Sequence, residues 1–125
     1  MTEKQIFILA TSRAAEFQPF IATLEADDQA TLIQVAGAQE TIDTAIRVVP
    51  ALVIIDEKID ANGGLALARQ LLQVNAFVQT VILSDMDEAA FHDAAEGLGV
   101  LMRLSLTPDS GDARQLLSHF RSLLP

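Results

Sequence analysis

The 125-residue chain contains no cysteine, tryptophan or tyrosine, and its only aromatic side chains are six phenylalanines. The absence of cysteine excludes disulfides, thiolate metal sites and cysteine nucleophiles. Because aromatics are so few while half of the residues are hydrophobic, the core must consist mainly of leucine, isoleucine, valine and alanine. Such a core suits helices packed on a sheet.

Positive charge is also scarce: 8 Lys and Arg stand against 17 Asp and Glu, which gives a net charge of −9. An acidic chain repels nucleic-acid phosphates and anionic membrane surfaces, so we expect neither as a partner. The first apolar run, residues 6–10, is far too short for a signal-peptide core or a membrane span. The sequence therefore predicts a cytoplasmic protein, folded as a single domain over residues 1–125.

Short apolar runs recur at nearly even spacing: residues 6–10, 31–36, 51–55, 80–84 and 100–104. The first, third and fourth runs are almost continuous, which is typical of strands covered on both faces of a parallel sheet. The second and fifth runs contain Gln34 and Arg103, which indicates strands nearer the edges.

The segments between these runs have the apolar spacing of helices. Pro19 is tolerated only in the first turn of a helix, so the first helix should begin near residues 16–18. Asp87, and either Ser110 or Asp112, are expected to cap later helices. The inward-facing residues are predicted to be Phe20, Ile21, Leu24, Ile42, Ala45, Ile46, Val49, Leu65, Ala68, Leu71, Leu72, Ala90, Phe91, Ala94, Leu98, Ala113, Leu116, Leu117, Phe120 and Leu124.

Strict alternation of strand and helix predicts an α/β fold: a doubly wound, flavodoxin-like (βα)5 parallel sheet in a three-layer sandwich, with strand order 2-1-3-4-5. In that order the sheet reverses between its first and third strands, and a site lies at their carboxyl ends. Residues 10–13 should therefore lie beside Asp56, with Ser84 and Leu104 nearby.

The segment PALVIIDEKIDANGGLALARQL, which starts at Pro50, resembles the third strand and third helix of response-regulator receiver (CheY-like) domains. In that family the strand ends in a phosphoacceptor aspartate, and a glycine follows eight residues later, as Asp56 and Gly64 do here. TVILSDMDEAA resembles the fourth strand, whose final hydroxyl residue falls on Ser84. The resemblance covers essentially the whole chain and implies a domain of two-component signal transduction.

Several positions depart from the pattern of this family. It places two acids that hold Mg²⁺ at the end of the first strand, whereas residues 10–12 supply no carboxylate. Its Lys-Pro pair after the fifth strand falls on Leu104 and Ser105, its strand-five aromatic near Leu101, and a customary proline on Asp60. The resemblance therefore implies a degenerate phosphorylation site, in which Asp56 is the only retained candidate metal ligand.

Several readings of the site residues stay open. Asp56 is a candidate phosphoacceptor, a polar residue that ends a buried strand and caps a neighbouring loop, or the ion-pair partner of Arg13. Arg13 is alternatively an exposed side chain at a helix start. Ser84 is a candidate switch hydroxyl or simply a serine that opens a loop, and Arg103 should point to the opposite side of its strand.

The function predicted from these residues is that of a pseudo-receiver, a two-component signalling domain that acts through protein–protein contacts without enzymatic activity or a cofactor. The alternatives are an active receiver, phosphorylated on Asp56 by a histidine kinase with Mg²⁺, and a small-molecule-binding flavodoxin-like domain. His92 and His119 lie on different predicted helices, and we find neither a catalytic triad nor a P-loop motif.

The expected partner is a protein, either a histidine kinase in a phosphorelay or a downstream regulator. A homodimer through the last helix is a further expectation, because that helix has a broad apolar stripe. The chain is expected to stand alone or to form one piece of a longer regulator.

Overall fold

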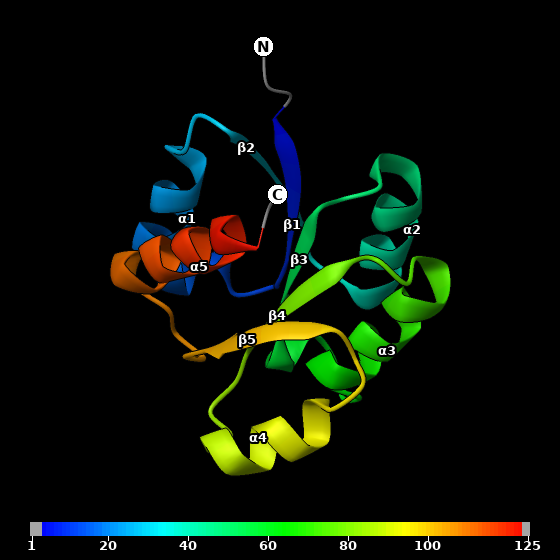
Figure 1. Cartoon of the computed structure of the whole chain (residues 1–125). Helices are drawn as coiled ribbons and strands as arrows, with labels where there is room; N and C mark the ends of the chain where they lie inside the picture. Colours follow the sequence, from blue (N-terminus) through cyan, green and yellow to red (C-terminus); the bar gives the residue numbers. More distant parts are fainter. Residues whose placement is uncertain (1–3, 124–125) are drawn as a thin grey trace.

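The computed structural model describes residues 4–123, which form a five-stranded parallel sheet with helices on both faces (Figure 1). The strands are β1 (Gln5–Ala10), β2 (Ala30–Val35), β3 (Leu52–Asp56), β4 (Gln79–Leu83) and β5 (Val100–Leu104). The helices are α1 (Gln18–Glu25), α2 (Ala38–Val48), α3 (Gly64–Val74), α4 (Glu88–Ala95) and α5 (Ser110–Ser122), with short 3₁₀ turns η1 (Ala14–Phe17) and η2 (Glu57–Ile59).

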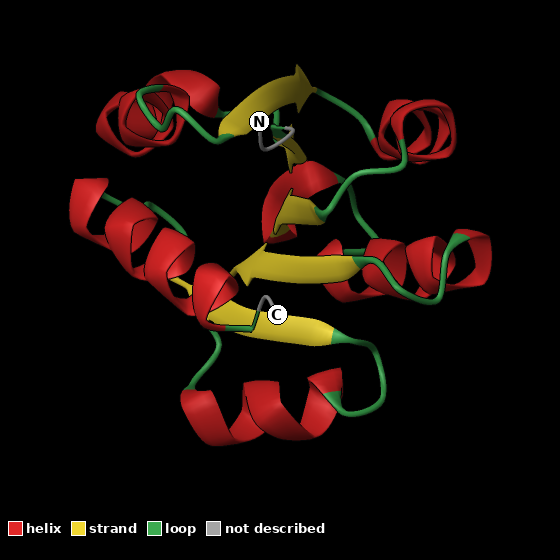
Figure 2. Ribbon diagram, turned by 45° about the horizontal axis from the view of Figure 1, so that its top comes forward, coloured by secondary structure: helices red, strands yellow, loops and turns green. Residues whose placement is uncertain are grey.

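The strand order is β2-β1-β3-β4-β5, which confirms the flavodoxin-like prediction. Figure 2 shows the layers: α1 and α5 cover one face of the sheet, α2 and α3 cover the other, and α4 lies beside β5. All five residues of β3 are buried, because this central strand has neighbours on both edges and helices on both faces. The outer strands β2 and β5 are only partly buried, as their interrupted apolar runs predicted.

Two of the predicted helix faces are wrong by about one position. In α2, Thr41 and Ala45 are buried, whereas Ile46 and Val49 are 57% and 66% exposed. The Thr41 hydroxyl tolerates burial because it donates a hydrogen bond to the Gly37 carbonyl within its own helix (2.7 Å). Val49 is the C-cap rather than part of the helix, so its side chain does not continue the buried stripe.

The second error concerns α4, which has only eight residues. It buries Phe91 and Ala95, four positions apart, and leaves Ala90 and Ala94 exposed. A short helix rich in alanine gives a weak periodic signal, because an alanine is accommodated on either face. Leu124, predicted as the last inward residue of α5, lies outside the described residues.

The start of α1 and the N-cap of α4 agree with the prediction, and the N-cap of α5 differs from it. α1 begins at Gln18 with Pro19 in its first turn, and the Asp87 side chain caps α4 by accepting from the Ala90 amide. The cap of α5 is Asp109 rather than Ser110 or Asp112, and Asp112 completes a reciprocal capping box. Within residues 4–123, no helix is long and apolar enough to cross a membrane.

Candidate functional site

Asp56 lies at the carboxyl end of the central strand, with its side chain fully buried. The register pairs Ala10 of β1 with Ile55 of β3, so the next residues along, Thr11 and Asp56, lie side by side. The Thr11 hydroxyl donates a 2.7 Å hydrogen bond to Oδ2 of Asp56. The order of strands thus brings together the two chain segments that the sequence predicted to meet.

Arg13 folds over Asp56 and binds both oxygens of its carboxylate. Its Nε donates to Oδ2 at 2.8 Å, and its Nη2 donates to Oδ1 at 2.9 Å. This two-point geometry is the strongest that an arginine and a carboxylate form. Because only 13% of the Arg13 side chain is exposed, the alternative of an arginine in solvent is wrong.

The same arginine also contacts the loop after β5. Its Nη2 donates to the carbonyl oxygen of Leu106 at 2.8 Å. Its guanidinium carbon lies 5.6 Å from the centre of the Phe17 ring, within the range of a cation–π contact. Its own backbone amide donates to the Thr11 hydroxyl at 2.9 Å, which fixes the start of the loop. Arg13 therefore links the ends of β1, β3 and β5.

Asp56 also caps the turn that follows it, as one reading of the sequence proposed. Its Oδ1 accepts a hydrogen bond from the Lys58 amide at 2.9 Å. Burial by itself would raise the pKa of Asp56, but hydrogen bonds from Arg13, Thr11 and the Lys58 amide outweigh it and hold this pKa below its ordinary value. The hydrogen bond to Asp56 correspondingly raises the pKa of Arg13. The pair is therefore ionised at neutral pH.

Ser84 lies just beyond β4 and is buried, and its hydroxyl is hydrogen-bonded locally rather than to Asp56. Its hydroxyl oxygen accepts from the Met86 amide at 3.1 Å, and its carbonyl oxygen accepts from Arg103 Nη1 at 2.7 Å. Arg103 also binds Glu88 of α4 at 3.0 Å. Arg103 thus points away from Asp56, as predicted, and ties β5 to the loop between β4 and α4.

No family model and no curated protein matches this chain. Solved structures do match. A LuxR-family two-component response regulator from an Aurantimonas species is 16% identical, with a TM-score of 0.81 over 96% of this chain and 87% of that chain. The signal receiver domain of NarL from Mycobacterium tuberculosis is 12% identical, with a TM-score of 0.79 over 95% and 98%. The response regulator domain of CheB from Thermotoga maritima is 15% identical, with a TM-score of 0.76 over 96% of each chain.

The chain has the receiver fold. Within that fold, the side chains around Asp56 are poor ligands for Mg²⁺, which prefers oxygen ligands that include one or two carboxylates. Both Asp56 oxygens accept from the Arg13 guanidinium, and Thr11 offers only a hydroxyl that already donates to Asp56. Among residues 4–123, no three acidic or histidine side chains gather where a metal ion could bind.

The remaining acids near the receiver site make other contacts, although the buried Oε2 of Glu57 has no hydrogen-bond partner. Glu57 turns toward the start of α3, where its Oε1 accepts from the Gly64 amide at 3.4 Å. Asp60 accepts from the amides of Asn62 and Gly63 within a tight turn. At the end of β5, the position that the family resemblance assigns to lysine is held by Leu104, which is 3% exposed and packs into the core.

Two contacts of Arg13 in this site differ in how far the sequence indicated them: the pair with Asp56 was left open, and the bond to the Leu106 carbonyl was not indicated. The sequence named the pairing of Arg13 with Asp56 as an alternative, and the structure selects it. It gave no sign of the Leu106 carbonyl, because any residue type carries a backbone oxygen.

Proposed function

We propose that this chain is a receiver-like signalling domain that acts through protein–protein contacts and does not depend on phosphorylation of Asp56. The observation that carries the proposal is the buried two-point ion pair between Arg13 and Asp56. The partner is a protein of a two-component system, either a histidine kinase or a downstream regulator.

The chemistry of phosphoryl transfer supports this proposal. Transfer to a carboxylate brings two anions together, and catalysis relies on positioning and on charge neutralisation by a metal and cations. An Asp56 oxygen would first have to give up its bond to Arg13. Among the described residues, no three acidic or histidine side chains gather where a metal ion could bind, and Leu104 carries no charge.

The ion pair also gives a structural reason why the carboxyl ends of β1, β3 and β5 keep one arrangement. Arg13 joins the loop after β1, the end of β3 and the loop after β5 through direct hydrogen bonds. Because the charge on Asp56 is already neutralised within the chain, the carboxyl ends of these strands need no phosphoryl group to hold one arrangement. A domain of this kind presents a constant surface to its partner, and it acts without a phosphorylation-dependent change of conformation.

The test is incubation with Mg²⁺ and acetyl phosphate, followed by intact-mass measurement. We expect no phosphoryl adduct on the native chain, and none on Arg13→Ala, because removal of the guanidinium supplies no metal ligand. Asp56→Ala is the matched control for adducts at other positions. A Mg²⁺-dependent adduct on the native chain that disappears in Asp56→Ala would establish the active receiver instead.

A second readout uses beryllofluoride with Mg²⁺ and amide NMR spectra, since the chain has no tryptophan or tyrosine for intrinsic fluorescence. We expect the amide shifts of residues 56–58 and of Ser84 to stay unchanged. Of the alternatives, the active receiver is the one that a specific observation favours: Asp56 ends β3 opposite Leu83 of β4, and Ser84 directly follows Leu83. The small-molecule alternative has less support, because neither the hollow of about 670 Å³ nor that of about 440 Å³ beside β5 is lined by Asp56.

A further inference from the structure

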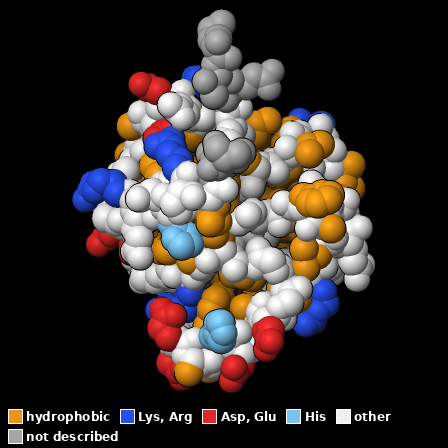
Figure 3. Space-filling view, viewed as in Figure 1, with side chains coloured by type: hydrophobic (Ala, Val, Ile, Leu, Met, Phe, Trp, Pro, Cys, Tyr) orange, Lys and Arg blue, Asp and Glu red, His pale blue; other side chains and the backbone are white. Residues whose placement is uncertain are grey.

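Large apolar side chains are exposed at one end of the layer that α2 and α3 form. Among the described residues five such side chains are strongly exposed, and four of them belong to this layer and its loops: Ile46 (57%), Val49 (66%), Val74 (42%) and Phe77 (92%). Figure 3 shows hydrophobic side chains gathered at the right of the view, over the region where Figure 1 places α2 and the loop after α3. We name these four residues the α2 patch.

The topology brings the α2 patch to one edge of the sheet. α2 ends where the chain enters β3, α3 ends where it enters β4, and the two helices contact each other on the same face. Leu52 pairs with Gln79, so the segments just before β3 and β4, which carry Val49 and Phe77, enter the sheet side by side. Exposed apolar groups gathered in this way are typical of a surface that binds another protein.

The backbone of Val49 is strained within this patch. Its φ of 48° is a left-handed conformation, which a glycine adopts without steric cost and a β-branched residue does not. The valine side chain is mostly exposed, so burial within the chain does not offset the strain. Strained residues of this kind gather at functional sites. An apolar side chain at this position is therefore better explained by a contact outside the chain than by the stability of the fold.

The charges beside the patch are complementary to a second copy of this chain. Asp43 and Arg47 are exposed on α2, and within residues 4–123 neither belongs to an ion pair. Each follows an isoleucine, Ile42 or Ile46, by one position, so both charges lie on the same side of the apolar row. When two copies of α2 pack antiparallel, Asp43 of one copy faces Arg47 of the other. Two-fold symmetry forms this pair twice.

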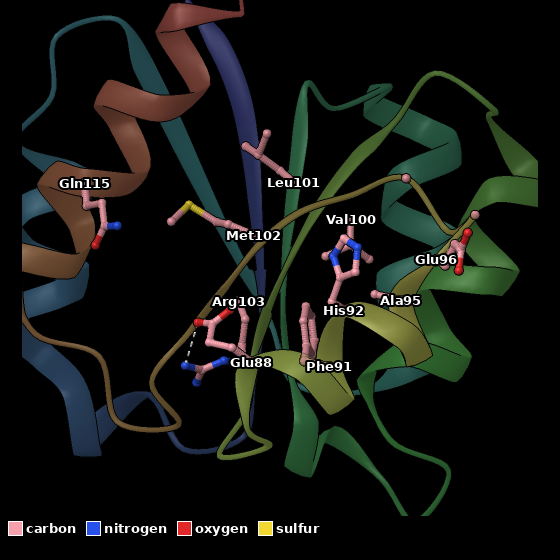
Figure 4. Close-up of a pocket in the computed structure, with 12 residues that line it drawn as sticks. Glu88, Phe91, His92, Ala95, Glu96, Val100, Leu101, Met102, Arg103 and Gln115 are labelled. Carbon is pink, nitrogen blue, oxygen red and sulfur yellow. Dashed lines mark hydrogen bonds and ion pairs between the residues drawn. The ribbon is translucent and has the colours of Figure 1, made fainter.

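Negative charge makes other surfaces less suitable for a second copy. Each copy carries a net charge of −9, and like charges brought together across an interface oppose association. Residues 61–84, which supply the α3 side of the patch, contain no acid. By contrast, Glu88 and Glu96 line the hollow of about 670 Å³ beside β5 (Figure 4). The stripe of α5 that suggested a homodimer is largely core, because its apolar residues are buried: Leu116, Leu117 and Phe120.

We propose that the chain forms a two-fold homodimer in which α2 packs antiparallel against α2 of a second copy. Ile46 and Val49 of the two copies cover one another, Val74 and Phe77 extend the contact toward α3, and two reciprocal Asp43–Arg47 pairs fix the register. The contact uses one face of an 11-residue helix, so it is small, and we expect a reversible dimer with a Kd of about 0.1 mM. This inference does not rest on the proposed function.

The experiment measures self-association of the full chain by sedimentation velocity from about 10 µM to about 1 mM. Interference optics replace absorbance, because the chain has no tryptophan or tyrosine. Amide NMR shifts that change on dilution locate the contact. The test variant is Ile46→Lys. The matched control is Leu123→Lys, which places the same charge at the fifth exposed apolar side chain, beside α5 on the other face of the sheet.

We expect Ile46→Lys to weaken the dimer at least about tenfold and Leu123→Lys to change its Kd less than about threefold. Asp43→Arg and Arg47→Asp should each weaken it about fivefold, because each places like charges opposite one another. The double exchange, Asp43→Arg with Arg47→Asp, forms the pairs again with their signs reversed and should return the Kd to within about twofold. Val49→Gly should weaken the dimer although it relieves strain in the fold.

A chain that stays monomeric up to about 1 mM would overturn the proposal. So would equal weakening by the two lysine variants, or a double charge exchange that associates as weakly as its single variants. Shift changes on dilution that concentrate in β5 or α5, rather than in residues 42–49 and 74–77, would assign the dimer to another surface and overturn it as well. None of these results affects the mass measurement on Asp56, so the two proposals fail separately.

Discussion

Replacing Arg13 with methionine should destabilise the protein by about 3 kcal/mol at pH 7. Methionine keeps an unbranched apolar stem but removes two hydrogen bonds to the fully buried Asp56 carboxylate. Removing one partner of a buried ion pair costs about 3–5 kcal/mol, because the other charge is left uncompensated. The lower end applies here, since Thr11 and the Lys58 amide still donate to Asp56.

The pH dependence of stability should change sign in this variant. In the native chain, hydrogen bonds lower the pKa of Asp56, so ionised Asp56 stabilises the folded state at pH values above its ordinary pKa. This stabilisation is lost as the pH falls through the lowered pKa. Without Arg13, desolvation dominates and the pKa of Asp56 rises. The folded variant then binds a proton more readily than its unfolded chain, so its stability increases as the pH falls toward 4.

The measurement is urea unfolding followed by far-UV circular dichroism, because the chain lacks tryptophan and tyrosine. Arg13→Met, Asp56→Asn and the double variant complete a thermodynamic cycle. We expect a coupling free energy of at least about 1.5 kcal/mol at pH 7, since contacting residues of one network are not additive. Additivity within about 0.5 kcal/mol, or an unchanged pH profile in Arg13→Met, would refute the ion-pair argument.

Two further predictions concern stability away from the site, and the same urea assay measures both. Thr80→Val should stabilise the protein by about 1 kcal/mol, because the Thr80 hydroxyl is buried without a hydrogen-bond partner. Its control, Thr41→Val, should destabilise the protein, because it removes a hydroxyl that is hydrogen-bonded. Val49→Gly should stabilise the protein by about 0.5–1 kcal/mol, because Val49 has a left-handed φ of 48° that costs a β-branched residue about 1–2 kcal/mol. Its control, Val48→Gly, lies within α2 and should destabilise the protein. Stability lowered by Thr80→Val or by Val49→Gly would contradict the corresponding argument.

The sequence predicted the sheet well because the central strands are buried on both faces, and burial of that kind leaves a continuous apolar run. Strand order then placed residues 10–13 beside Asp56, since the carboxyl ends of parallel strands share one edge. The phase of a short helix is harder to predict. In α4 the alanines fit either face, and only the packing of Phe91 decides which side is buried.

The pairing within the site needed the structure for a different reason. Arg13 reaches Asp56 only because the loop after Thr11 turns back toward the sheet, and the direction of a long, flexible side chain leaves no periodic signal in the sequence. The Leu106 carbonyl is even less visible, because its role depends on the path of the loop after β5 and not on the leucine side chain.

An aspartate at the end of the central strand of a receiver fold is therefore weak support for phosphorylation when considered alone. A buried carboxylate is costly unless charged or hydrogen-bonding groups surround it. In this chain a guanidinium, a hydroxyl and a backbone amide meet that requirement from within. The same groups that stabilise Asp56 occupy the oxygens that a phosphoryl group or a metal ion would need. What distinguishes a phosphoacceptor from a structural aspartate is thus the set of donors around it, and under the proposed function Arg13 is the donor that makes Asp56 structural.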